Sequence, residues 1–94
     1  MPKTYIVASI NVTDLDLYAT YVKRAEMVTK AAGGKLLVSG GRTEPIEGAL
    51  HNRVVVIEFE NIEAARQAAK GYLALRGVRG ASAPDYDSVI VEGI

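Results

Sequence analysis

Glu58 is the charged residue in this sequence that is best suited to proton transfer. It stands between Ile57 and Phe59 in the most apolar of the strand-like stretches. Burying a carboxylate is costly unless it is paired or protonated, and such surroundings suit a general acid or base. Two interpretations stay open. Either Glu58 accepts a proton in a site, or it lies near the end of a strand, where it is solvated or paired with an arginine.

Two arginines near glycines are candidates for binding an anion. Arg79 lies near the start of the last loop, and Arg42 follows the pair Gly40-Gly41. A guanidinium can fork onto a carboxylate with two hydrogen bonds, so Arg79 would hold either a substrate carboxylate or Glu58. Arg42 would line the mouth of a pocket or the rim of a dimer.

Tyr18 and Tyr21 share the apolar stripe of a predicted helix, on the side that faces the sheet. Their hydroxyls would orient a ligand in a cleft between the helix and the sheet. The alternative is that both rings pack in the core with a tethered polar tip. The candidate substrate-binding residues are therefore Tyr18, Tyr21, Arg42 and Arg79.

Other kinds of site are excluded by residues or spacings that the sequence lacks. There is no cysteine, which removes disulfides, thiolate nucleophiles and cysteine-ligated metals. The single histidine, His51, has no partner at metal-ligand spacing. Ser39 lacks the glycine pattern of a nucleophile elbow, and the glycine pairs lack that of a phosphate-binding loop. We expect neither a metal nor a cofactor.

The elements that must position these residues follow the order βαββαβ. β-Branched stretches predict strands over residues 5–12, 35–39, 53–59 and 88–92. The first helix is capped by Thr13 or Asp14 and ends at Gly33-Gly34, and the second is capped by Asn61. This order predicts an α+β, ferredoxin-like fold: an antiparallel four-stranded sheet with both helices on one face.

Three glycines are expected to interrupt these elements. Gly71 is predicted to end or break the second helix, with another short turn of helix within residues 72–79. The pair Gly40-Gly41 indicates a bulge or a close approach of the backbone to another group.

The strands are apolar at consecutive positions, as in residues 36–38, 54–57 and 89–91. Strands of a sheet with one solvent-exposed face alternate apolar and polar residues. Consecutive apolar residues therefore predict that both faces of this sheet are buried. Two short helices cover only one of them. A homodimer formed through the open sheet face follows from this mismatch.

The size and the net charge of the chain limit its domain number and its possible partners. Ninety-four residues make one domain, 1–94, and the net charge is +0. A balanced charge argues against nucleic acid or an anionic membrane as partner. Because there is no signal peptide and no apolar run long enough to span a bilayer, the sequence predicts a cytoplasmic location.

Several stretches in a fixed order also carry a resemblance to a known family. They are Val12-Thr13-Asp14, then residues 33–41, Glu47-Gly48, residues 53–59, residues 72–79, and Val91-Glu92-Gly93. Together they resemble the bacterial domain-of-unknown-function family 1330 over nearly the whole chain. The resemblance implies a small dimeric α/β barrel of the ferredoxin-like kind, without an assigned reaction.

Three functions remain open from the sequence. The first is a homodimer that binds a small metabolite in the cleft between helices and sheet. The second is a cofactor-independent, oxygenase- or isomerase-like enzyme with Glu58 as proton acceptor, Arg79 as anion anchor and the tyrosines as donors. The third is a purely structural dimer. Either ligand hypothesis predicts that the dimer has one closed cleft that touches Glu58, Arg79 and Tyr21.

Overall fold

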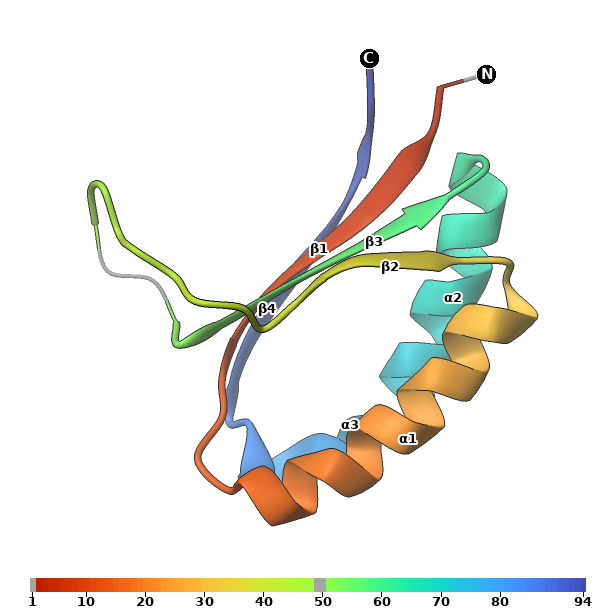
Figure 1. Cartoon of the computed structure of the whole chain (residues 1–94). Coiled ribbons are helices and arrows are strands. Elements are labelled where there is room, and N and C mark those ends of the chain that lie inside the picture. Colours follow the sequence, from red (N-terminus) through yellow and green to blue (C-terminus); the bar gives the residue numbers. More distant parts are fainter. Residues whose placement is uncertain (1, 49–50) are drawn as a thin grey trace.

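The computed structural model describes residues 2–48 and 51–94 of the chain (Figure 1). In chain order the elements are β1 (Thr4–Asn11), α1 (Leu15–Ala31), β2 (Lys35–Ser39), β3 (Arg53–Phe59), α2 (Ile62–Ala74), α3 (Arg76–Arg79), the 3₁₀ turn η1 (Gly80–Ser82) and β4 (Asp85–Glu92). Within those two ranges, no helix combines the length and the apolar character needed to cross a membrane.

The four strands form one antiparallel sheet in the order β2-β3-β1-β4, and both long helices lie on the same face of it (Figure 1). The predicted α+β, ferredoxin-like arrangement is confirmed. The bounds of β2 and β3 coincide with the prediction, whereas β4 begins three residues earlier than expected, at Asp85. The reason is pairing: Asp85 and Tyr86 extend the ladder opposite Asn11 and Ile10 although Asp85 is not a strand-forming residue.

The first helix begins and ends at the residues that the sequence indicates. The Asp14 side chain accepts a hydrogen bond of 3.0 Å from the amide of Leu17 and so caps α1. Gly33 follows the helix with a φ of 70°, which an L side chain rarely adopts. Gly34 serves packing instead, because a Cβ there would lie 2.7 Å from the Phe59 ring.

The second helix corrects one prediction. Asn61 caps it as expected, accepting from the amide of Ala64 at 2.9 Å. However, α2 runs through Gly71 to Ala74, so Gly71 neither ends nor breaks it. A Cβ at Gly71 would lie 2.5 Å from Cγ1 of Val28. The glycine therefore allows α2 and α1 to approach each other, and the further turn of helix begins only at Arg76, as α3.

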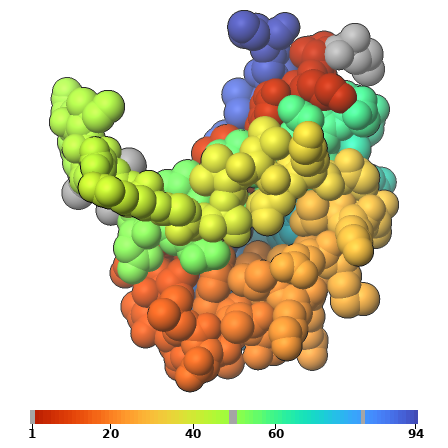
Figure 2. All heavy atoms as spheres, in the orientation of Figure 1, coloured from red at the N-terminus to blue at the C-terminus, as the bar shows by residue number. Residues whose placement is uncertain are grey.

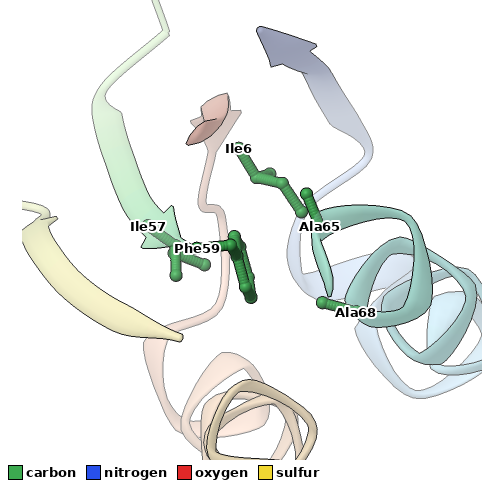
Figure 3. Close-up of a cluster of buried hydrophobic side chains, with 5 residues drawn as sticks. All are labelled: Ile6, Ile57, Phe59, Ala65 and Ala68. Carbon is green, nitrogen blue, oxygen red and sulfur yellow. The ribbon is translucent and has the colours of Figure 1, made fainter. Parts of the chain in front are cut away.

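The core between α2 and the sheet is built from small helix residues and large strand residues. Figure 3 shows Ile6 of β1 and Ile57 and Phe59 of β3 directed toward Ala65 and Ala68 of α2. Phe59 is 1% exposed and Ala65 is 0% exposed. Alanines hold the helix axis close to the strands, and Phe59 fills the space that they leave.

The other face of the sheet carries an apolar row that none of the described residues covers. Val38, Val56, Val7 and Val89 are register partners and form one row across all four strands. Val38 is 41% exposed and Val89 is 56% exposed. We call this row the valine row. The expectation that both faces need burial therefore corresponds to a real apolar surface.

The glycine pair after β2 makes a close approach and not the bulge. The register shifts between Leu36 and Val38, so the irregularity is at Leu37. Gly40 has a φ of 66°, and a Cβ on it would lie 2.4 Å from the guanidinium carbon of Arg53. From there the chain continues as an extended arm that projects from the body of the molecule (Figure 1).

Candidate ligand-binding cleft

A cavity of about 400 Å³ lies between α1 and the helix-facing side of the sheet. In Figure 2 the surface is hollowed between β2 (yellow) and α1 (orange). The volume falls within the range of about 300–1,000 Å³ that is usual for small-molecule sites. Its apolar walls come from both sides: the strands contribute Ile6, Ala8, Ile10, Leu36, Val55 and Ile57, and α1 contributes Val22, Ala25 and Met27.

The strand register explains why these side chains meet. Ile6 pairs with Ile57 and Ala8 pairs with Val55, so alternate residues of β1 and β3 point to the same side. Leu36 continues the Ile57 row onto β2. It is 47% exposed although it faces the helix side, because α1 does not close over the β2 edge. The cleft opens there.

The polar lining is dominated by tyrosines. Tyr18 and Tyr21 are 4% and 3% exposed, and their ring centroids are 5.5 Å apart. Both line the cavity, as do Tyr72 and Tyr86. The sequence-predicted position of Tyr18 and Tyr21 on the face of α1 that looks at the sheet is thus observed.

Burial changes the acidity of these phenols. It raises the pKa of Tyr86 far above its ordinary value of 10.0, with the neighbouring Tyr21 adding to the effect. It also raises the pKa of Tyr18, although Arg53 opposes part of that rise. The Tyr18 and Tyr86 hydroxyls are therefore neutral at pH 7 and act as hydrogen-bond donors or acceptors.

Tyr72 is held by a hydroxyl relay at the α1–α2 contact. Its hydroxyl hydrogen-bonds that of Thr29, which donates to the carbonyl oxygen of Ala25 at 3.0 Å. Because Thr29 has a single hydroxyl proton, Tyr72 is the donor in the first bond. The Tyr72 oxygen keeps its acceptor capacity toward the cavity.

Two arginines stack on the tyrosines. The Arg79 guanidinium lies 3.8 Å from the centroid of the Tyr86 ring and 5.9 Å from that of Tyr21. Arg53 lies 5.4 Å from the Tyr18 centroid. Arg53 lines the cavity, whereas Arg79 is separated from it by the tyrosine rings and lines a second cavity of about 390 Å³ between α2 and β4.

Glu58 lies on the opposite face of the sheet. Its neighbours in the strand, Ile57 and Phe59, point to the helices, so Glu58 points to the open face. There the Tyr5 hydroxyl donates to its carboxylate at 3.3 Å. Within the single chain, the structure therefore does not bring Glu58 together with Arg79 or Tyr21. A cleft of the dimer that touches all three stays a prediction.

The remaining candidates lie outside the cleft. Arg42 is on the exposed arm, where it pairs with Glu44 at 3.0 Å. His51 contacts Asp87 at 3.1 Å near the sheet surface. Among the described residues, no three His, Cys, Asp or Glu side chains are grouped so that they could hold a metal ion.

Sequence reasoning missed Arg53 and Tyr86 as cleft residues. Strand alternation could have found Arg53, because it shares its parity with Val55 and Ile57. Tyr86 could not be found in this way, since its segment was predicted as a loop and becomes a strand only by pairing with β1.

Comparison with known proteins gives a family and a fold. The family described as a domain of unknown function, DUF1330, matches the chain over residues 3–94. A comparison with curated proteins finds no match.

Solved structures share the fold at low sequence identity. A protein of unknown function from Rhodopseudomonas palustris is 16% identical with a TM-score of 0.67, covering 99% of this chain and 83% of that one. A dimeric ferredoxin-like protein of unknown function from Thermobifida fusca is 11% identical with a TM-score of 0.62, covering 98% and 92%. A "putative antibiotic biosynthesis monooxygenase" from Caulobacter crescentus is 12% identical with a TM-score of 0.67, covering 99% and 91%. At these identities the likeness shows the fold alone.

Proposed function

This chain belongs to the DUF1330 family, and from that premise we propose that it is a small-molecule-binding protein whose ligand occupies the cleft between α1 and the sheet. The observation that carries the proposal is the make-up of the cavity. It combines apolar side chains of the strands and of α1 with four tyrosines and Arg53, and three charged side chains of α1 also line it: Lys23, Glu26 and Lys30. Apolar walls with a few convergent polar groups are typical of ligand sites.

The same proposal includes a homodimer that forms through the valine row. An uncovered row of four valines is better explained by a second copy than by solvent. The structural neighbour from Thermobifida fusca is described as dimeric, and so is a ferredoxin-like neighbour from Bacteroides fragilis. A cytoplasmic location completes the proposal.

The geometry of the cleft does not support the enzyme hypothesis with the residues that the sequence suggested. Its proton acceptor, Glu58, lies across the sheet from the cleft and is not among the residues that line it. The only carboxylate that lines the cavity within the described chain is Glu26, on the exposed side of α1. Binding without catalysis is therefore the function that the cleft supports best.

Two neighbouring leucines allow a matched test. Leu36 lines the cleft and is 47% exposed, whereas Leu37 is 46% exposed and does not line it. Leu36→Trp should narrow the opening of the cleft with little cost to folding. Leu37→Trp is the control, because it adds the same ring at the next residue, outside the cleft. A panel of small aromatic and branched aliphatic acids, amides and alcohols would be screened by thermal shift on the full chain.

We expect at least one compound of the panel to raise the melting temperature of the wild type and of Leu37→Trp, and to lose this effect in Leu36→Trp. At a ligand concentration about 100 times the Kd, the stabilisation is about 2.7 kcal/mol. A panel without any stabilising member, or equal stabilisation of both tryptophan variants, would contradict binding in the cleft and leave the purely structural dimer.

A further inference from the structure

Arg53 stands at the polar end of the cleft and is held there by its neighbours. Its guanidinium lies over the Tyr18 ring, and Nη2 is 3.5 Å from Oγ of Ser39. The Gly40 backbone lies directly against it, with no room for a side chain at that position. An arginine restrained in this way loses less side-chain entropy when it binds a ligand.

The positive charge of Arg53 has no carboxylate partner in the part of the chain that the structure describes. The ion pairs found there involve Lys3, Arg42, His51 and Arg66. The Nε atom of Arg53 is buried and makes no hydrogen bond. A half-buried guanidinium without a counter-charge is unfavourable, and an anion in the cleft would relieve this cost.

The charges around the cavity favour an anion as well. Lys23 and Lys30 on α1 line its rim together with Glu26, so three cationic side chains, counting Arg53, face one carboxylate. The Arg79 guanidinium, stacked on Tyr86 and Tyr21, adds positive charge behind the tyrosine rings.

The rest of the cavity restricts the kind of anion. Beyond the Arg53 end, the walls are mainly apolar side chains of the sheet and of α1, which suit an apolar body. A phosphate usually sits on backbone amides at a helix N-terminus, but α1 is capped by its own Asp14 side chain. The Arg53 guanidinium alone can still hold a carboxylate through two parallel hydrogen bonds.

We propose that the ligand of this cleft is a small carboxylic acid with an aromatic or branched apolar body, whose carboxylate is bound by Arg53 with support from Ser39 and the Tyr18 hydroxyl. This inference rests on the proposed function, because it names the chemical class of the ligand for the same site. It assigns to Arg53 the anchoring role that the sequence suggested for Arg79.

The test compares acids with neutral amides of the same shape. Phenylacetate and phenylacetamide, and benzoate and benzamide, would be titrated into the full-length protein and followed by NMR of the cleft isoleucine methyl groups. We expect each acid to bind about 10- to 100-fold more tightly than its amide, because a hydrogen bond to a charged group is stronger than a neutral one.

Three variants locate the source of this preference. Arg53→Gln should remove the preference for the acid while amide binding persists, and Arg53→Lys should keep part of it, because the charge remains but the fork is lost. Arg42→Gln, which removes an exposed arginine outside the cleft, should behave as the wild type.

The outcomes separate this inference from the proposed function. Equal binding of acid and amide in the cleft, or an acid preference that survives Arg53→Gln, would overturn the carboxylate inference and leave cleft binding intact. If the amides shift the cleft methyl groups and the acids do not, the ligand class is wrong. If no compound of either series shifts them, both the inference and the proposed function are contradicted.

Discussion

The contact between Gly71 of α2 and Val28 of α1 gives a prediction in which two known effects oppose each other. Replacing glycine by alanine inside a helix stabilises it by about 1 kcal/mol through helix propensity. The Cβ of Gly71→Ala would, however, lie 2.5 Å from Cγ1 and 3.1 Å from Cγ2 of Val28. Valine is stiff in a helix, so its side chain cannot rotate away, and overpacking of this kind costs about 1–3 kcal/mol.

We therefore expect Gly71→Ala to be neutral or to destabilise the protein by up to about 2 kcal/mol, despite its better helix propensity. In a Val28→Ala background the clash is absent, and the same substitution should stabilise by up to about 1 kcal/mol. The change of sign is the signature of the contact, since additive sites would give the same value in both backgrounds.

Gly77 of α3 provides the matched control. Apart from its chain neighbours and the backbone of its own helix, no heavy atom of the described residues lies within 4 Å of the Cβ that would be added there, so Gly77→Ala reports propensity without a clash. The free energy of unfolding would be measured by urea denaturation at one fixed protein concentration, because a dimer makes stability concentration-dependent. If Gly71→Ala stabilises the wild type as much as Gly77→Ala does, the close α1–α2 contact is refuted.

Three further predictions follow from the core, the tyrosines and the open sheet face. Phe59→Ala should lower the free energy of unfolding by about 3–5 kcal/mol, because Phe59 is only 1% exposed in the core. If the variant keeps most of its stability, the cluster of Figure 3 is not the core. Burial raises the pKa of Tyr86 and of Tyr18, so the unfolded chain releases these protons first. Stability is then complete below about pH 10 and falls as the pH rises beyond it; an ultraviolet titration in which all five tyrosines ionise together near their ordinary value would contradict this. Val56→Glu places a charge in the middle of the valine row and should convert a dimer of twice 10.1 kDa into a monomer in sedimentation equilibrium, whereas Lys70→Glu on α2 should not. A wild type that sediments as a monomer would remove the dimer from the account.

The strands and helix caps could be read from the sequence because their causes are local. Asp14 and Asn61 cap the helices through their own side chains, and the β-branched run of β3 needs no distant partner to be recognised. The extension of β4 back to Asp85 depends on pairing with β1, which a local pattern does not contain. Gly71 was misplaced for a similar reason: its role is set by Val28, a residue far away in the chain.

Sequence analysis placed site residues correctly only where the periodicity of a single helix decides which way their side chains point. Tyr18 and Tyr21 are three residues apart on one helix, so their common direction follows from helix geometry, and both line the cleft. The apolar neighbours of Glu58 indicated a buried carboxylate. Side chains alternate along a strand, however, so Glu58 points to the opposite face of the sheet from those neighbours. Whether Arg79 reaches the cavity depends on the rings of Tyr21 and Tyr86, and this could be seen only in three dimensions.

The isoleucines of the chain make cleft binding directly measurable. Ile6, Ile10 and Ile57 line the cavity, whereas Ile46 and Ile94 are fully exposed away from it. With isoleucine methyl groups labelled, the panel of small acids, amides and alcohols would be added to the full-length protein and methyl shifts recorded. The account predicts saturable shifts at Ile6, Ile10 and Ile57 and none at Ile46 or Ile94. If every compound leaves the three cleft methyl groups unmoved, or moves those of Ile46 and Ile94 as much as those of the three cleft residues, the claim that this cleft binds a small molecule is contradicted.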